Sequence, residues 1–102
     1  MAFAHAIKLD ELTIGVGRQH IINGKTLALF LTESGCYAID DACPHRGAPL
    51  HEGACIGTEV VCPWHSARFD LTNGTHQNPP AKSGVRSYPT RVQDGMIEID
   101  ID

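Results

Sequence analysis

Two short segments, CPHRGAPL at residues 43–50 and CPWH at residues 62–65, decide how this 102-residue chain is organised. Each segment offers one thiol and one imidazole. Sixteen residues separate the histidine of the first segment from the cysteine of the second, which is enough for a short excursion of a sheet to bring the segments face to face. Thiolates and imidazoles suit zinc or iron rather than calcium or magnesium. The candidate metal ligands are therefore Cys43, His45, Cys62 and His65.

The order of these ligands carries further information. A zinc finger usually supplies a cysteine pair from one element and a histidine pair from another, whereas here each segment supplies one of each. This mixed order is what a binuclear cluster needs when one iron takes two cysteines and the other takes two histidines, as in a Rieske [2Fe–2S] centre. A structural zinc site and a disulfide beside two incidental histidines remain alternatives. The disulfide is the weaker one, because Pro44 and Pro63 follow the cysteines and shape tight loops.

The chain resembles a Rieske ferredoxin through the two segments, through Leu50-x-x-Gly53 between them and through Asn73-Gly74 after them. The resemblance covers nearly the whole chain. It implies an all-β fold, an antiparallel β sandwich or barrel with a small cluster-binding subdomain at its tip, and one Rieske-type [2Fe–2S] cluster. It also implies that thiolates hold the inner iron and imidazoles the outer iron, with Cys43 and Cys62 in the first role and His45 and His65 in the second.

Four positions depart from the Rieske proteins of respiratory cytochrome bc complexes, whose segments resemble C-x-H-x-G-C and C-P-C-H-G-S-x-Y. In those proteins two extra cysteines form a disulfide, and Ser and Tyr hydroxyls bond to the cluster sulfurs. This chain has Ala48, Trp64, Ala67 and Phe69 there. Because hydrogen bonds to the sulfurs stabilise the reduced state, we predict a potential near the bottom of the Rieske range of about −150 to +300 mV. Trp64 is expected to pack beside the cluster, and the alternative is an exposed aromatic that docks to a partner.

A length of 102 residues predicts a single domain over residues 1–102, and short strands between glycine and proline turns favour a sandwich or barrel. The resemblance implies that the cluster-binding subdomain lies at about 41–82. Asn23-Gly24 and Asp94-Gly95 are strong hairpin signals. Alternation in 25–32 and 96–101 predicts strands with one buried face. The predicted strands are 3–8, 16–22, 25–32, 36–40, 58–61, 67–70, 87–92 and 96–101, with a turn at 9–12.

Residues around the two segments receive simpler interpretations. Cys36 and Cys55 are expected to be small buried residues. Gly47 and Gly53 are expected to permit special backbone angles or close approach. A surface position is expected for His51, and solvated positions for the acidic residues near the first segment, which are Asp40, Asp41 and Glu52.

The net charge and the lack of long apolar segments limit the classes of partner that the protein can have. A formal net charge of −4 argues against a nucleic-acid partner. The sequence has neither a secretory signal nor an apolar stretch of membrane-spanning length, so we expect a cytoplasmic protein without a membrane partner. The resemblance implies a one-electron carrier rather than an enzyme, monomeric when free, between a flavin-dependent NAD(P)H reductase and a terminal oxygenase of the aromatic-ring dioxygenase type. The alternatives are the small Rieske subunit of an NADH-dependent nitrite reductase and a zinc-stabilised interaction module.

Overall fold

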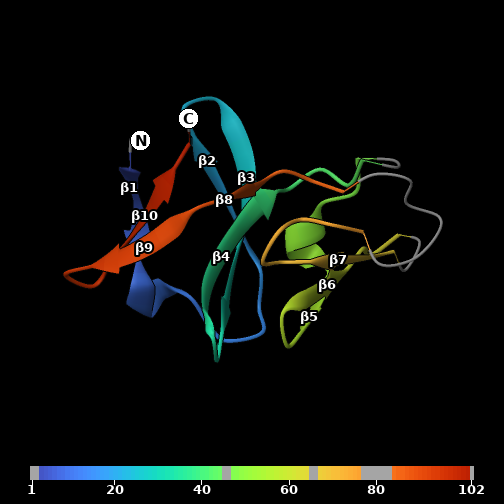
Figure 1. Ribbon diagram of the computed structural model, residues 1–102, viewed down its shortest axis with the longest axis horizontal. Coiled ribbons are helices and arrows are strands. Elements are labelled where there is room, and N and C mark those ends of the chain that lie inside the picture. Colours follow the sequence, from blue (N-terminus) through green and yellow to red (C-terminus); the bar gives the residue numbers. More distant parts are fainter. Residues whose placement is uncertain (1–2, 45–46, 65–66, 77–83, 102) are drawn as a thin grey trace.

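The computed structural model describes residues 3–44, 47–64, 67–76 and 84–101, which form three antiparallel sheets (Figure 1). The all-β prediction is confirmed. The first sheet has the order β1-β10-β9, with β1 at Phe3–Lys8, β10 at Met96–Asp100 and β9 at Thr90–Gln93. The second has the order β2-β3-β4-β8, with β2 at Arg18–Ile22, β3 at Lys25–Thr32, β4 at Gly35–Asp40 and β8 at Ser87–Tyr88. The third has the order β5-β6-β7, with β5 at Ala54–Ile56, β6 at Glu59–Val61 and β7 at Arg68–Asp70. Two 3-10 turns are η1 at Leu9–Glu11 and η2 at Leu50–Glu52.

Both predicted two-residue hairpins are confirmed. Asn23 and Gly24 join β2 to β3 with φ angles of 49° and 77°, and Asp94 and Gly95 join β9 to β10 with 53° and 76°. Two successive positive φ angles define the type I′ turn, whose twist matches that of the flanking strands. These turns fix the register of the two hairpins.

The strand β3 is buried on both faces, which corrects the prediction of a single core-facing side. Leu27 and Leu29 belong to one cluster of buried side chains, whereas Ala28 and Phe30 belong to another. The reason is that the second sheet lies between the other two sheets, so that neither of its faces is open (Figure 1). We call the first cluster the base core, and it comprises Ile7, Leu12, Leu27, Leu29, Cys36, Ala38, Tyr88, Ile97, Ile99 and Ile101. We call the second the tip core, and it comprises Ala28, Phe30, Ile39, Cys43, Ala48, Leu50, Val60, Cys62, Ala67, Phe69 and Leu71.

Two further strand predictions need correction. The expected strand 87–92 is divided at Pro89, and its halves β8 and β9 join different sheets; proline has no N–H to donate to a ladder. The half-burial expected for β10 is also wrong, because Glu98 and Asp100 are buried too. Glu98 is accommodated because it accepts a 2.6 Å hydrogen bond from Arg91 Nε and lies 2.7 Å from His5 Nε2. The hydrogen bond from Arg91 lowers the pKa of Glu98, although desolvation opposes this shift.

The chain leaves the second sheet and returns to it at one place. Ala38 and Ile39 of β4 pair with Tyr88 and Ser87 of β8, and the Asp40 N–H donates to the Arg86 carbonyl at 2.9 Å. The third sheet and its loops therefore lie between two neighbouring crossing points. The predicted subdomain at about 41–82 stays a prediction, since its far boundary and the Pro79-Pro80 loop lie outside the described residues.

Within the described part of the chain, no helix is long and apolar enough to cross a membrane.

Candidate metal centre

Two loops carry the predicted cysteines and are closed in the same way. In the first cysteine loop, residues 41–50, the Cys43 N–H donates to the Ala48 carbonyl at 2.9 Å. In the second cysteine loop, residues 62–67, the Cys62 N–H donates to the Ala67 carbonyl at 2.7 Å. In both cases the acceptor is an alanine five residues after the cysteine. The two loops therefore present their cysteines from equivalent backbone positions.

The two cysteines lie in one shared core. Cys43 is 2% exposed and Cys62 is 1% exposed, and both belong to the tip core together with the two loop-closing alanines. The described parts of the two loops lie in the same half of the molecule as the third sheet (Figure 1). The structure thus brings together two thiols that eighteen intervening residues separate along the chain.

Local backbone geometry explains the shape of the first cysteine loop. Gly47 has φ 75°, and its N–H donates to the Cys43 carbonyl at 2.7 Å. The Leu50 N–H then donates to the Asp41 carbonyl at 2.7 Å, and Ala42 forms a bridge with Pro49. A left-handed φ favours glycine, so Gly47 allows the turn that returns the chain to η2.

Gly53 serves a different purpose from Gly47, and both predictions for these glycines are confirmed. The φ of Gly53 is −76°, which any residue adopts. However, a Cβ at this position would lie 2.0 Å from the Val61 carbonyl oxygen. Gly53 therefore lets η2 approach β6 and the second cysteine loop. At Gly47 a Cβ would meet nothing within 4 Å, so this residue contributes only its backbone angle.

The second cysteine loop is held by strand pairing. Val61 pairs with Arg68 and Val60 pairs with Phe69 across β6 and β7. Trp64 within this loop is 61% exposed, so the expectation that it packs beside the cluster is wrong. The interior beneath the loop is already occupied by Ala67 and Phe69, both fully buried, and the indole is left on the surface.

The predicted imidazole ligands, His45 and His65, lie outside the described residues, as does Arg46. The ligand assignment as a whole therefore stays a prediction. Across 3–44, 47–64, 67–76 and 84–101, no group of three or more His, Cys, Asp or Glu side chains could hold a metal ion.

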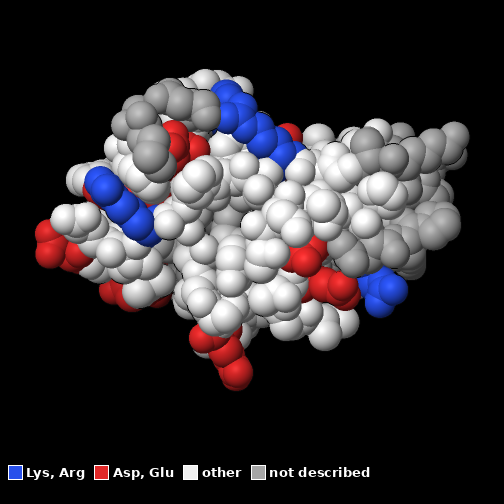
Figure 2. All heavy atoms as spheres, in the orientation of Figure 1, with Lys and Arg blue, Asp and Glu red and all other residues white. Residues whose placement is uncertain are grey.

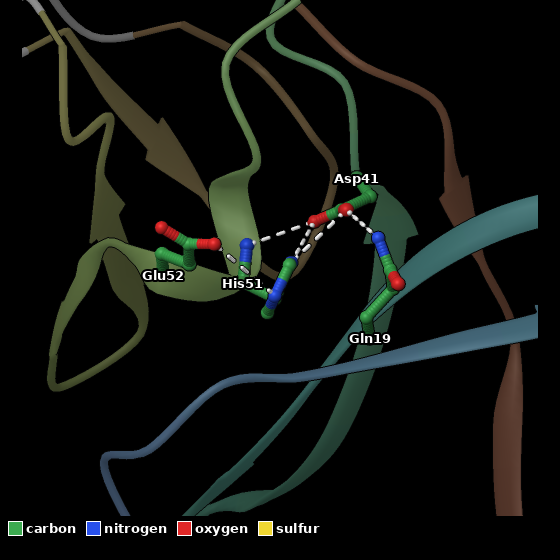
Figure 3. Close-up of polar contacts among 4 residues, drawn as sticks. All are labelled: Gln19, Asp41, His51 and Glu52. Atoms are coloured by element: carbon green, nitrogen blue, oxygen red, sulfur yellow. Dashed lines mark hydrogen bonds and ion pairs between the residues drawn. The ribbon is translucent and has the colours of Figure 1, made fainter.

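Polar residues around the first cysteine loop differ from expectation. Asp41, predicted to be solvated, has a side chain only 5% exposed, and His51, predicted at the surface, is 21% exposed. The two side chains meet at 2.9 Å, and Gln19 of β2 also contacts Asp41 (Figure 3). No sequence spacing indicates this cluster, because the loop closure brings its members together. By contrast, Glu52 is 63% exposed, in agreement with its expected solvation.

Charged side chains on the face seen in Figure 2 lie in small separate groups of both signs rather than in one continuous patch. The acidic groups are spread over both ends of the described surface in this view. The net charge of −4 is therefore distributed, and this face offers no broad basic surface of the kind that binds a nucleic-acid backbone.

The other two cysteines are separate from the candidate site. Cys36 is buried in the base core as predicted, and burial raises the pKa of its thiol to about 11. Cys55 is only half-buried, which corrects the prediction for it, and its Sγ lies 3.7 Å from the Gly57 carbonyl oxygen. Burial raises the pKa of this thiol as well. The four cysteines, all within the described residues, form no disulfide.

The residues that are described fit an iron–sulfur cluster. Two soft sulfur donors emerge from equivalent loop positions into one apolar core, and thiolates are the ligands that such clusters use. The neighbouring Ala48, Ala67 and Phe69 are fully buried and carry no hydroxyl. Among the described residues, these three side chains surround the thiols with apolar groups and supply no hydrogen-bond donor.

Comparisons with known proteins also indicate an iron–sulfur protein. A model of the Rieske [2Fe-2S] domain matches residues 3–89. The ferredoxin component of the naphthalene 1,2-dioxygenase system of Pseudomonas putida is 31% identical over 96 residues, which cover 94% of this chain and 92% of that protein. The ferredoxin component of the p-cumate 2,3-dioxygenase system of Pseudomonas putida is 36% identical over 94 residues, covering 90% and 80%.

A solved structure also matches throughout. The ferredoxin of carbazole 1,9a-dioxygenase from Nocardioides aromaticivorans IC177 superposes with a TM-score of 0.94 over 100% of both chains, at 27% identity. With the buried cysteine pair and the three-sheet fold, these matches show that the chain belongs to the Rieske [2Fe-2S] domain family, as an electron-transferring ferredoxin with one such cluster.

Proposed function

We propose that Cys43 and Cys62 bind one iron of the cluster and that His45 and His65 bind the other. The observation that carries this proposal is the matched closure of the two loops, which places both cysteines in the tip core. A [2Fe–2S] cluster with two imidazole ligands supplies a site that gains and loses one electron. Its reduction potential is higher than that of an all-cysteine plant-type cluster, which lies at about −400 mV. The buried alanine and phenylalanine side chains around the thiols keep water from the sulfur side of the site.

The carrier takes electrons from a flavin-dependent NAD(P)H reductase and delivers them to a terminal oxygenase of the aromatic-ring dioxygenase type. The support is that two similar proteins are named as ferredoxin components of dioxygenase systems, with most of each chain covered. We propose that the free protein is a cytoplasmic monomer that meets each partner transiently. An acidic net charge of −4 is compatible with docking to a basic surface of a partner.

The genes beside the one that encodes this chain provide a direct test of the partners. We expect an oxygenase large subunit and a flavin reductase among them, and gel filtration of the purified protein should give the mass of a single chain. A nitrite reductase large subunit beside the gene, together with a tight stoichiometric complex on purification, would instead favour a fixed subunit. A colourless protein without iron would remove both assignments.

We predict a low midpoint potential that rises when hydroxyl donors are restored. Ala67→Ser and Phe69→Tyr each place a hydroxyl where bc-type Rieske proteins have one, beside the buried cysteines. Because hydrogen bonds to cluster sulfurs stabilise the reduced state, each variant should have a higher potential than the wild type in a redox titration. Leu71→Met, a change in the same core without a hydroxyl, should leave the potential nearly unchanged. A wild-type potential well above zero would contradict the prediction.

Trp64 is predicted to contribute to docking with the oxygenase. Its indole is 61% exposed on the second cysteine loop, next to a proposed ligand, and exposed tryptophans often dominate the binding energy of interfaces. Trp64→Ala should weaken binding to the oxygenase about 30-fold, corresponding to about 2 kcal/mol, without changing the absorption spectrum or the potential. Titration of the reduced protein into its oxygenase measures this effect.

Ile21→Ala supplies the matched control, because Ile21 is 64% exposed but lies on β2, in a different sheet. Its affinity for the oxygenase should equal that of the wild type. Equal affinities for the Trp64→Ala and Ile21→Ala variants would remove the indole from the docking surface.

A further inference from the structure

Asp41 is a buried carboxylate at the start of the first cysteine loop, with three donors around it. The His51 N–H donates to Oδ1 at 2.8 Å, His51 Nδ1 lies 2.9 Å from Oδ1 and 3.0 Å from Oδ2, and Gln19 Nε2 donates to Oδ2 at 2.9 Å (Figure 3). A carboxylate only accepts, so Nδ1 carries the proton of the imidazole. These contacts join the end of β4, η2 and β2.

The burial of this carboxylate is costly without such partners. An ionised group removed from water loses several kcal/mol of solvation unless charge or hydrogen bonds compensate. Here every donor comes from a neighbouring element, and the Asp41 main chain adds bonds to Thr26 and Leu50. The Asp41 main chain therefore joins the two ends of the first cysteine loop, while its side chain fixes this junction to His51 of η2 and to Gln19 of β2.

The position of Asp41 also gives it an electrostatic role. It lies two residues before Cys43, so the chain between their Cα atoms spans at most about 7 Å. A negative charge repels an added electron, and the repulsion is stronger where side chains exclude water. Cys43 is 2% exposed and Asp41 is 3% exposed, so little solvent is present to screen the interaction.

We infer that Asp41 is a positioning residue of the redox centre, whose buried carboxylate fixes the first cysteine loop and holds the midpoint potential of the cluster low. This inference rests on the proposed role of Cys43 as an iron ligand. Asp41 itself is not proposed as a ligand. Its charge would be a second cause of the low midpoint potential, beside the absence of hydroxyl donors at Ala67 and Phe69.

Asp41→Asn tests the inference by removing the charge while keeping the shape of the side chain. The amide oxygen still accepts the His51 N–H. We expect normal iron and sulfide content, nearly unchanged EPR g-values of the reduced protein, and a midpoint potential shifted upward. Glu98→Gln is the matched control, because Glu98 is also a buried carboxylate, 9% exposed, but lies on β10 in the first sheet. Its potential should equal that of the wild type.

Gln19→Lys tests the same charge from the partner side. Gln19 is exposed, and a lysine there can donate to Asp41 and neutralise it without changing the buried residue. The potential should again rise, while Gln93→Lys, the same change on exposed β9, should leave it unchanged. If Asp41→Asn does not assemble its cluster, Gln19→Lys decides the question.

The outcomes separate this inference from the ligand assignment. A normal cluster whose potential is unchanged or lowered in both Asp41→Asn and Gln19→Lys overturns the role of Asp41 and leaves Cys43 as a ligand. An equal rise in the two control variants also overturns it, because the effect would then be general. Wild-type protein that binds no iron under anaerobic preparation removes the ligand proposal instead.

Discussion

Replacing Cys43 or Cys62 with alanine is expected to abolish the [2Fe–2S] cluster. Each thiolate is proposed to supply one of the two sulfur bonds to the same iron, and the surrounding tip core offers no substitute donor among the described side chains of Ala48, Ala67 and Phe69. Iron and acid-labile sulfide should fall from about two atoms each per chain, the composition of the cluster, to near zero. The visible absorption and the EPR signal of the reduced protein should disappear with them.

The other two cysteines provide the controls for this result. Cys55→Ala and Cys36→Ala make the same chemical change at a half-buried position on β5 and in the base core. Both variants should keep the wild-type iron content and spectrum. His65→Ala should lose the normal spectrum as the cysteine variants do. A wild-type spectrum in the Cys43→Ala or His65→Ala protein would refute the ligand assignment.

Gly53→Ala should strongly destabilise the fold beside the candidate site. The new Cβ would lie 2.0 Å from the Val61 carbonyl oxygen and 3.2 Å from that of Leu50, and neither backbone group can rotate away as a side chain would. We expect a loss of about 3 kcal/mol, the upper part of the range for overpacking. For a domain of this size, Tm should fall by roughly 12 to 24 °C.

Gly47→Ala is the informative comparison for Gly53→Ala. Its Cβ would meet nothing within 4 Å, so only the φ of 75° is unfavourable. The expected cost is about 1 kcal/mol. Thermal unfolding of the two apoproteins, followed by far-ultraviolet circular dichroism, measures both values. A Gly53→Ala protein as stable as Gly47→Ala would show that η2 and β6 can separate without penalty.

Local sequence signals predicted the hairpins well, because the chemistry that specifies them is local. Asn23-Gly24 and Asp94-Gly95 adopt positive φ angles at both positions, and residues 3–8 and 25–32 form strands with the predicted bounds. Burial was harder to predict, since it depends on what covers each face. Every side chain from Leu27 to Phe30 is apolar, and alternation within 25–32 gave no indication that a second core lies on the other side.

The short strand β5 at Ala54–Ile56 was not predicted. Its three residues contain no strong alternation, and it exists because Ala54 and Cys55 pair with Val61 and Val60 across a tight turn. Pairing of this kind depends on the partner strand rather than on the intrinsic preference of the segment. The same dependence on partner strands explains why the segment 87–92 forms two strands. β8 and β9, on either side of Pro89, pair within different sheets, although the segment looks continuous in the sequence.

The candidate site could be predicted in part, because the types and spacing of cysteine and histidine residues indicate which metal they suit. The two segments were predicted to face each other, and the structure buries Cys43 and Cys62 in one core, while their role as ligands stays a prediction. The environment of Asp41 was not predictable, since its partners lie at positions 19 and 51 and meet only after the loop closes. The exposure of Trp64 was not predictable from its residue type, because it depends on which side chains fill the space beneath the loop, and Ala67 and Phe69 are fully buried there.

The adjacent crossing points of β4 and β8 have a consequence for protein engineering. Because Asp40 and Arg86 are joined by a backbone hydrogen bond, everything between them can be regarded as a cassette attached through two neighbouring ends. Such a cassette could be transplanted onto an antiparallel sheet whose strands supply the side chains that Ala28, Phe30 and Ile39 contribute to the tip core. In such a chimera, the segment between Asp40 and Arg86 could be exchanged for that of another protein while the first and second sheets keep their fold.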